Sequence, residues 1–311
     1  MKITKAILPV AGLGTRFLPW TKVVPKELLP IGNRPIIAHL VDECLDAGIS
    51  DICFVISRGK EAIPQYFAHD TKLAAELDRR GKLHHLEELK RYDSVRFTTV
   101  YQDEQLGDGH AILQAASWVG NAPIAVLFGD DLFLGKDPGL TQLLQAYEYA
   151  ENGAVIALEN VPKEDVERYG IVEVESEHPK NPRLKKLKSL MEKPSPEEAP
   201  STLGIVGRYI LPRKIFDQLV ELNQDSGVLR QKMNVLTVNP DWTTEKFFEG
   251  KTEPIQDNQL WTTGTEIRII DALIRALPTT PIHGLECEGT RLDTGTPQGY
   301  AKAVQAWHER Q

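Results

Sequence analysis

The residues best suited to chemistry lie near the start of the chain, where closely spaced glycines are followed by two cations. The turn consists of Ala11, Gly12, Leu13, Gly14, Thr15 and Arg16, and it follows an apolar run at residues 6–10. Glycines at alternate positions let backbone N–H groups converge on an anion, because no Cβ stands in the way. Arg16 and, ten residues later, Lys26 add positive charge. The pattern predicts a strand that leads into a binding loop for phosphate or another anion.

Two familiar glycine loops do not fit this segment. The Walker pattern requires Gly-Lys-Ser or Gly-Lys-Thr, which the chain lacks, and the dinucleotide fingerprint requires a third glycine where Phe17 stands. A nicotinamide-dependent dehydrogenase is therefore disfavoured, and nicotinamide binding would test that alternative.

A second candidate group is the acidic pair Asp130 and Asp131, which follows an apolar run at residues 123–128. A carboxylate at the carboxyl end of a strand is well placed to hold Mg²⁺, a hard cation that prefers oxygen ligands and shares its shell with substrate phosphates. Adjacent acids in a loop are more often turn or N-cap residues, but the position after a strand reverses that preference. We therefore predict that Asp130 binds the metal ion.

The elements that must position these residues alternate between strands and helices. Apolar runs predict strands at residues 6–10, 52–56, 96–101, 123–128 and 154–159, and helical spacing predicts helices at residues 35–47, 60–67, 140–150 and 298–309. A strand, a helix and a second strand in succession favour a parallel βαβ unit with a right-handed crossover. Ligands bind at the carboxyl edge of such sheets, and Gln102 follows one of the predicted strands. The fold class is therefore predicted to be α/β.

The wider string around the glycine turn is far more specific than the turn itself. Gly-x-Gly-Thr-Arg-x-x-Pro, followed by Pro-Lys-Glu-x-x-Pro around Lys26, resembles the signature of the sugar-1-phosphate nucleotidyltransferases and is most similar to the bacterial UTP–glucose-1-phosphate uridylyltransferases. The resemblance implies a Rossmann-like, glycosyltransferase-A-like fold with a mixed, mostly parallel sheet flanked by helices. It implies a single domain over residues 1–311, with an insertion at about residues 222–262.

The resemblance also implies roles on the nucleotide side. Arg16 and Lys26 would be catalytic, because they would neutralise the triphosphate and the departing pyrophosphate. The nucleotide-binding residues would be Ala11, Gly12, Leu13, Gly14, Thr15, Glu27, Gln102 and Gly107. A carboxamide such as that of Gln102 offers both a donor and an acceptor, which suits the edge of uracil. Asp103 and Asp108 depart from the residues expected in close relatives, so the choice of base stays open.

The second half of the chain resembles the sugar side of the family. Gly170 lies in a Tyr-Gly-Ile-Val turn, and Glu192 and Lys193 lie in a Glu-Lys-Pro element. The resemblance implies that Gly170, Glu192, Lys193 and Val206 bind the sugar and that Lys193 also holds its phosphate. Asp293 would be the second metal carboxylate. The family's helix start near residue 264 is altered at Arg268 and Ile270, and Pro297 replaces a lysine that is frequent in close relatives.

The implied reaction joins UTP and glucose 1-phosphate to give UDP-glucose and pyrophosphate, with Mg²⁺ as cofactor. Two alternatives remain open. The chain could be a sibling enzyme that uses dTTP, CTP, ATP or another hexose 1-phosphate, or a non-catalytic homologue that binds a nucleotide sugar and regulates a partner. The presence of Arg16, Lys26 and Asp130 argues against the second.

Composition limits the partners. The 311 residues include 36 basic and 44 acidic residues, a net charge of -8, so no overall positive field favours nucleic acid or an anionic membrane. The N-terminus shows no signal-like apolar segment, which predicts a cytoplasmic protein. Three widely spaced cysteines fit neither a disulfide framework nor a clustered zinc site. The resemblance implies a homodimer or homotetramer.

Overall fold

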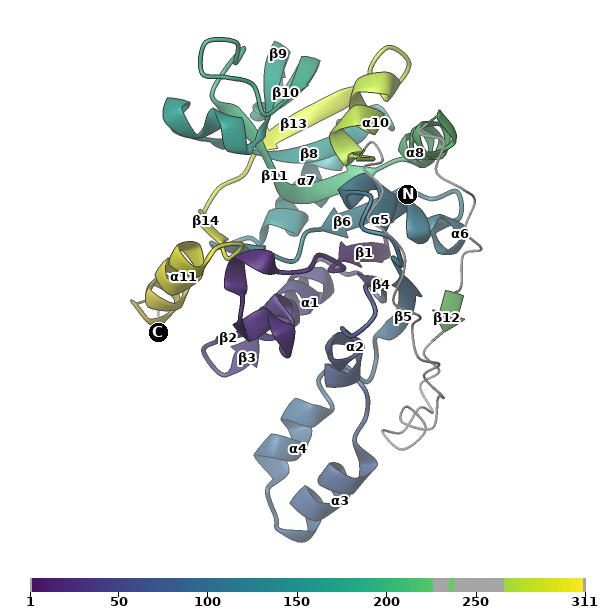
Figure 1. Ribbon diagram of the computed structural model, residues 1–311, viewed down its shortest axis with the longest axis vertical. Coiled ribbons are helices and arrows are strands. Elements are labelled where there is room, and N and C mark those ends of the chain that lie inside the picture. The colour runs from purple at the N-terminus through teal and green to yellow at the C-terminus, as the bar shows by residue number, and fades with distance from the viewer. Residues whose placement is uncertain (1, 226–234, 238–265, 310–311) are drawn as a thin grey trace.

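The fold is built on one sheet of ten strands. The computed structural model describes residues 2–225, 235–237 and 266–309. The order across the sheet is β12 (Val235–Thr237), β5 (Arg96–Tyr101), β4 (Asp51–Ile56), β1 (Lys5–Pro9), β6 (Ile124–Leu127), β11 (Leu203–Leu211), β8 (Ala154–Asn160), β13 (Ile282–Glu286), β10 (Asn181–Glu192) and β9 (Gly170–His178). Helices flank this sheet on both sides (Figure 1). The predicted α/β class with a mixed central sheet is confirmed.

Parallel pairing is less widespread than the sequence predicts. The four strands β5, β4, β1 and β6 are parallel to one another, as are β8 and β13, whereas the remaining neighbours are antiparallel. The difference arises in the second half of the chain. There β9 and β10 follow each other with only residues 179 and 180 between them, a connection too short for a parallel crossover.

The strands read as continuous apolar runs because both faces of the sheet are buried. On β1, Leu8 belongs to one core cluster and Ile7 to the other, as expected for side chains that alternate between faces. The first face is covered by α1 (Ile36–Asp46) and α7 (Gly139–Tyr147). The second is covered by α5 (Asp108–Gln114), α6 (Ala116–Val119), α8 (Arg213–Asp225) and α10 (Ile269–Ala276).

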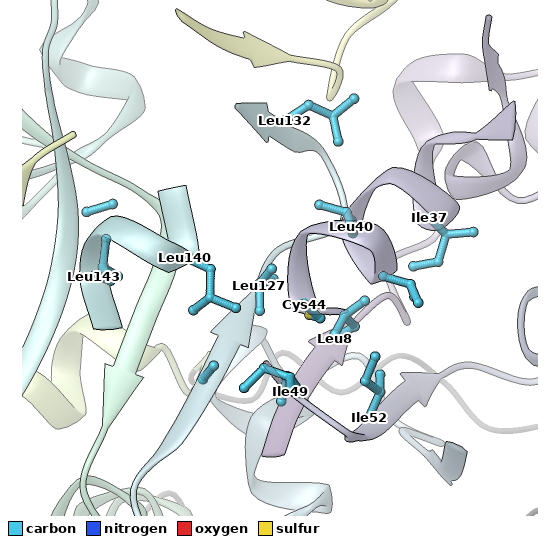
Figure 2. Close-up of a cluster of buried hydrophobic side chains, with 14 of the residues drawn as sticks. Leu8, Ile37, Leu40, Cys44, Ile49, Ile52, Leu127, Leu132, Leu140 and Leu143 are labelled. Carbon is cyan, nitrogen blue, oxygen red and sulfur yellow. The ribbon is translucent and has the colours of Figure 1, made fainter. Parts of the chain in front are cut away.

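The packing of α1 confirms the helix predicted at residues 35–47. Its side chains Ile37, Leu40 and Cys44 lie in the same cluster as Leu8 of β1 and Ile52 of β4 (Figure 2). All five residues are fully buried. At the start of this helix the N–H of Ile36 donates to the carbonyl of Leu29 at 3.0 Å, which ties the helix to the segment just after Lys26.

Several smaller elements lie outside the main sheet. The charged segment at residues 71–90 forms two surface helices, α3 (Thr71–Arg79) and α4 (Leu83–Leu89), which extend away from the sheet beyond α2 (Ala62–Tyr66) (Figure 1). The remaining elements are the short helices η1 (Thr15–Phe17), η2 (Trp20–Lys22), η3 (Lys26–Leu28) and η4 (Lys163–Arg168), the strand pair β2 (Pro30–Ile31) and β3 (Arg34–Pro35), and α11 (Pro297–Glu309).

A separate two-stranded ribbon carries the acidic residues. It consists of β7 (Asp131–Leu134) and β14 (Thr290–Asp293), which pair antiparallel with Asp131 opposite Asp293. Two segments that are far apart in the sequence thus bring their aspartates to one place.

Most of the predicted insertion at residues 222–262 lies outside the described residues. The described parts are the end of α8 and the strand β12, which pairs antiparallel with β5 at the edge of the sheet. The single-domain organisation stays a prediction. No helix within residues 2–225 and 266–309 is both long and apolar enough to cross a membrane.

One buried ion pair joins helix α1 to strand β11. The fully buried guanidinium of Arg208 donates to both carboxylate oxygens of Glu43, at 3.0 and 2.7 Å, and to the carbonyl oxygen of Asp131 at 2.6 Å. Removing one partner of a buried pair leaves an uncompensated charge, which costs about 3–5 kcal/mol. Glu43→Gln is therefore expected to lower the free energy of unfolding by about that amount.

Urea denaturation of this variant would test the estimate. The matched control is Glu221→Gln, a change at an exposed position of α8, for which we expect a change within about 0.5 kcal/mol. A loss below about 1 kcal/mol for Glu43→Gln would mean that other groups compensate the charge of Arg208.

Candidate active site

A cavity of about 760 Å³ opens beside the β7–β14 ribbon. Five of the residues singled out from the sequence line it: Arg16, Asp130, Lys193, Val206 and Asp293. They come from the glycine turn, the end of β6, the end of β10, β11 and the end of β14. The fold therefore gathers into one cavity residues that are spread over most of the chain.

The two predicted metal carboxylates converge on a single glycine. A Cβ atom at Gly295 would lie 3.0 Å from a carboxylate oxygen of Asp130 and 3.0 Å from one of Asp293. The backbone N–H of Gly295 donates to Asp293 at 2.8 Å. Two carboxylates side by side, facing an open cavity, match what Mg²⁺ needs when phosphates and water complete its shell. In the described part of the chain no group of three or more His, Cys, Asp or Glu side chains could hold a metal ion.

Asp130 and Asp131 differ in what they contact. The Asp131 side chain accepts a hydrogen bond from the backbone of Gly207 at 2.8 Å and forms an ion pair with Arg291 at 2.5 Å. The Asp130 carboxylate instead forms an ion pair with the Lys26 ammonium at 2.7 Å. Of these two aspartates, Asp130 is therefore the one that contacts a predicted catalytic residue.

The Lys26–Asp130 pair is partly buried, with side chains that are 17% and 32% exposed. Burial by itself would lower the pKa of Lys26, but the carboxylates of Asp130 and Glu27 outweigh it and raise that pKa. Burial likewise opposes ionisation of Asp130, and Lys26 outweighs it, so the pKa of Asp130 is lowered. Both groups are held in their charged forms.

The glycine turn leaves open space where the sequence predicts phosphate binding. Gly14 has a left-handed φ of 68°, and a Cβ there would lie 3.0 Å from Thr21. At Gly12, by contrast, no atom lies within 4 Å of the position a Cβ would take. Packing therefore explains Gly14, whereas Gly12 leaves its surroundings free for a ligand. Leu13 and Thr15 are exposed beside it, and Ala11 is buried.

Glu27, a predicted nucleotide contact, does not face the cavity. Its side chain is 1% exposed, and both carboxylate oxygens accept from the Lys60 ammonium, at 3.1 and 2.9 Å. Lys60 also donates to the carbonyl oxygen of Val10 at 2.8 Å, directly before the glycine turn. Glu27 therefore lies in an interior pair that ties η3 to the start of the turn.

Gln102 and Gly107 likewise make their contacts within the protein. The Gln102 side chain is buried, and its amide nitrogen donates to the carbonyl of Gly107 at 2.9 Å and lies 3.2 Å from His110 Nδ1. Gly107 has a φ of 105°, and a Cβ there would lie 2.5 Å from the carbonyl oxygen of Ile267. In this arrangement the Gln102 amide nitrogen supports its own loop, so base reading would require it to turn outward.

Three of the four predicted sugar residues line a smaller cavity of about 250 Å³, and Val206 lines only the larger one. Gly170, Glu192 and Lys193 line the smaller cavity, and a Cβ at Gly170 would lie 2.6 Å from Ile270. Lys193 adopts a φ of 48°, which is uncommon for a residue with a side chain. Its backbone N–H donates to the carbonyl of Tyr169 at 3.0 Å, which joins the two predicted sugar-binding segments.

The structure adds residues that the sequence analysis missed. Arg168 and Tyr169 line both cavities, and Arg291 lines the larger one. Asp108, which the sequence singles out only as a departure from close relatives, also lines both. Arg168 lies 3.4 Å from Asp293. The available signal was position: Arg168 and Tyr169 directly precede Gly170, and Arg291 lies two residues before Asp293, on the same face of a strand.

Asp108 is half-buried, and its carboxyl group makes the stability of the protein depend on pH. Its carboxylate accepts from the N–H of Ile269 at 2.9 Å, at the start of α10. Burial, with a smaller contribution from Glu192 and Glu266, raises the pKa of Asp108 to about 6. Between the unfolded and folded pKa values the folded protein binds more protons, so stability falls as pH rises from about 4 to about 6 and then stays level.

We therefore expect Asp108→Asn to raise the free energy of unfolding by about 1–3 kcal/mol at pH 7.5, with a smaller gain toward pH 4. Urea denaturation at pH 7.5 and 4.5 measures the difference. Asp70→Asn is the control, because Asp70 caps α3 at an exposed position through the N–H of Leu73. An equal gain at both pH values would show that the charge of Asp108 is not its cause.

Comparison with known proteins gives a consistent result. The family model described as nucleotidyl transferase matches residues 5–310. The chain is 35% identical to a UTP–glucose-1-phosphate uridylyltransferase of Bacillus subtilis strain 168, over 97% of this chain and 88% of that relative. It is 36% identical to the enzyme of the same name from Staphylococcus epidermidis, over 97% and 91%. It is similar to the structure of a UTP-bound UGPase from Acinetobacter baumannii, with a TM-score of 0.80 at 32% identity over 99% and 94% of the two chains.

Proposed function

Because this chain belongs to the nucleotidyl transferase family, we propose that it transfers a uridylyl group from UTP to glucose 1-phosphate, which yields UDP-glucose and pyrophosphate. The resemblance inferred from the sequence is confirmed at the level of the family and of its named members. The observation that carries the proposal for the site is the convergence of Asp130, Asp293, Arg16 and Lys193 on one cavity.

The chemistry needs no side-chain nucleophile. The phosphate of glucose 1-phosphate attacks the α-phosphorus of UTP, and a phosphate monoester is largely dianionic at pH 7, since its second pKa is about 6. It therefore needs no general base. The obstacle is the repulsion between two polyanions that must meet in line, which fixed positive charge and orientation relieve.

Each charged residue then has a role. Lys193 would hold the incoming phosphate beside Glu192, which would accept hydrogen bonds from the sugar hydroxyls. Arg16 and Lys26 would neutralise the triphosphate and stabilise the charge that develops on the departing pyrophosphate. Asp130 and Asp293 would hold Mg²⁺, which when bound supplies further positive charge at the reacting phosphates.

The glycine turn would contribute backbone groups rather than charge. Gly12 leaves space at the turn, so the N–H groups of the segment from Ala11 to Thr15 can approach phosphate oxygens or the base. Gly170 and Val206 would border the sugar. Two structural relatives are described as a UDP-glucose complex and a UTP-bound form, which supports the choice of ligands.

One observation keeps a sibling enzyme as the second candidate. The amide nitrogen of Gln102, the residue expected to read the base, is bonded to Gly107 within the protein. If Gln102 keeps this arrangement when nucleotide binds, the base is selected elsewhere, and dTTP, CTP or ATP could replace UTP.

Pyrophosphate release tests the proposal. The purified protein would be assayed with Mg²⁺ and glucose 1-phosphate against UTP, dTTP, CTP and ATP in turn. Fast release with UTP alone is the expected result. Preference for another triphosphate would support the sibling enzyme. Nucleotide binding without release from any of the four would favour another sugar phosphate or a non-catalytic regulatory role, and a second panel of hexose 1-phosphates would separate these two.

We propose that the enzyme works in the cytoplasm on small molecules, without nucleic acid or membrane partners, in line with its net charge of -8. A homodimer or homotetramer is the proposed assembly, which sedimentation of the purified protein would test.

A further inference from the structure

The β7–β14 ribbon is a small structure that needs support from the rest of the protein. It carries Asp293 at the end of one strand and is preceded by Asp130 at the start of the other, yet it has only two strands of four residues each. A two-stranded sheet is marginally stable unless something packs against it. The distance between the two carboxylates therefore depends on what anchors the ribbon to the rest of the protein.

Arg291 of β14 provides an anchor with three directed contacts. Its Nη1 lies 2.5 Å from Asp131 Oδ1, its Nε lies 2.5 Å from Glu159 Oε2, and its Nη2 donates to the hydroxyl of Tyr169 at 3.0 Å. The side chain is 9% exposed. The first contact crosses the ribbon, the second reaches β8 of the main sheet, and the third reaches the residue directly before Gly170.

These contacts connect the two halves of the proposed site. Asp131 neighbours the metal residue Asp130, and Arg291 and Asp293 lie two residues apart on one strand, so their side chains share a face. Tyr169 neighbours Gly170, and its carbonyl accepts from the N–H of Lys193. One guanidinium thus joins the carboxylate pair to the segments proposed to hold the sugar and its phosphate.

Other contacts also hold the ribbon, but they do not join the two sides of the site. The carbonyl of Asp130 accepts from the N–H of Thr294 at 2.7 Å and from its hydroxyl at 2.9 Å. Asp131 is also held by the N–H of Gly207 at 2.8 Å, and Arg208 contacts its backbone carbonyl. Neither of these contacts extends to the sugar side. Arg168 lies 3.4 Å from Asp293, but its side chain is 52% exposed, so solvent weakens the contact.

We propose that Arg291 is a positioning residue that holds the metal carboxylates and the sugar-binding turn in register. The inference rests on the proposed function, because it assigns metal and sugar roles to the two groups that Arg291 joins. Lysine at this position would keep the charge but lose the planar fork, so it could not meet three acceptors in different directions.

The test measures metal binding without turnover. Mn²⁺, which also accepts oxygen ligands, is titrated into the protein alone and followed by electron paramagnetic resonance. For Arg291→Lys we expect Mn²⁺ binding about tenfold weaker, the lower end of what loss of a supporting contact costs a metal site. We expect a rise of about tenfold in KM for glucose 1-phosphate in the same variant.

Two comparison variants separate the effect on the metal side from the effect on the sugar side. Tyr169→Phe removes only the contact on the sugar side, so it should raise KM for glucose 1-phosphate and leave Mn²⁺ binding unchanged. Arg96→Lys changes an arginine of β5 that pairs with Asp51 and is 73% exposed, so it should alter neither constant.

A purely structural role predicts a different pattern. Arg291→Lys would then lower the melting temperature or the active fraction, and hence kcat, while both Mn²⁺ affinity and KM stayed at wild-type values. That result, or a shift in only one of the two constants, would overturn the proposal. If Arg291→Lys does not fold, Glu159→Gln removes one anchor whose carboxyl is 37% exposed. Smaller shifts of both constants are then expected, and no shift would overturn the proposal.

Failure of the proposed function would look different. A wild-type protein that makes no UDP-glucose refutes the function, whereas the Mn²⁺ titration does not depend on turnover. An unchanged Mn²⁺ affinity in Arg291→Lys, with normal wild-type activity, refutes only the positioning role.

Discussion

Lys26→Ala is expected to lower the rate of UDP-glucose formation by about two to four orders of magnitude. The ammonium is proposed to neutralise charge that grows on the leaving pyrophosphate. Removal of one such electrostatic group commonly costs about two to three orders of magnitude. The larger figure allows for the loss of a second contact, because Lys26 also pairs with Asp130 at 2.7 Å.

The pair with Asp130 predicts a second, opposite effect of the same variant. In the described arrangement the Lys26 ammonium and a metal ion compete for one carboxylate. Without Lys26, the protein alone should bind Mn²⁺ at least as tightly as the wild type, although turnover with UTP collapses. A general loss of folding could not produce this combination.

The matched control is Lys22→Ala. Lys22 is an exposed lysine on the same segment, and its removal takes away one positive charge at a similar place in the chain. Turnover should stay within about twofold of wild type, a difference below 0.5 kcal/mol. If Lys26→Ala keeps more than about a tenth of wild-type turnover, the lost stabilisation is under about 1.4 kcal/mol and the catalytic role is refuted.

The elements that sequence reasoning located well are those whose signal is local. The strands at residues 96–101 and 154–159 and the helix α1 follow from hydrophobic spacing alone, because burial on one or both faces fixes which residues are apolar. The placement of Asp130 in the cavity follows similarly, since a strand end determines which edge of the sheet a residue reaches.

What sequence reasoning missed depends on contacts between distant segments. The partners of Arg291 are 132, 160 and 122 residues away in the chain. No spacing rule relates such positions, because the strand order that brings them together is itself a result of folding. The antiparallel half of the sheet was missed for a related reason: hairpin connections and crossovers were not distinguished after residue 159.

Gln102, Gly107 and Glu27 illustrate a different limit. Their residue types suit a nucleotide site and suit interior hydrogen bonding equally well. Gly107 is required by the close approach of the Ile267 carbonyl, and Glu27 by the charge of Lys60. A motif therefore identifies where a site lies, but only the packing shows which of its members face the ligand.

Asp130→Ala is the second large effect that we expect, and its neighbour supplies the contrast. Loss of a proposed metal carboxylate should lower turnover by about two to three orders of magnitude. The melting temperature should fall only modestly, because the Asp130 side chain is 32% exposed at the cavity and its partner Lys26 keeps the nearby carboxylate of Glu27. Asp131→Ala, by contrast, should mainly lower the free energy of unfolding. It removes the partner of Arg291 and of the Gly207 N–H, both buried, and should cost about 3–5 kcal/mol.

Both variants should be measured by Mn²⁺ titration, thermal unfolding and steady-state kinetics. These measurements show whether each aspartate binds the metal ion or supports the structure. For Asp130→Ala, Mn²⁺ affinity should fall, and the melting temperature should fall less than in Asp131→Ala. For Asp131→Ala, the melting temperature should fall, and any loss of activity should follow the loss of folded protein and the release of Arg291. If Asp130→Ala instead retained Mn²⁺ binding and more than about a tenth of wild-type turnover, Asp130 would not be a metal ligand. The convergence of Asp130 and Asp293 at Gly295 would then need another explanation, namely that the two carboxylates serve to hold Lys26 and Arg168 beside the phosphates.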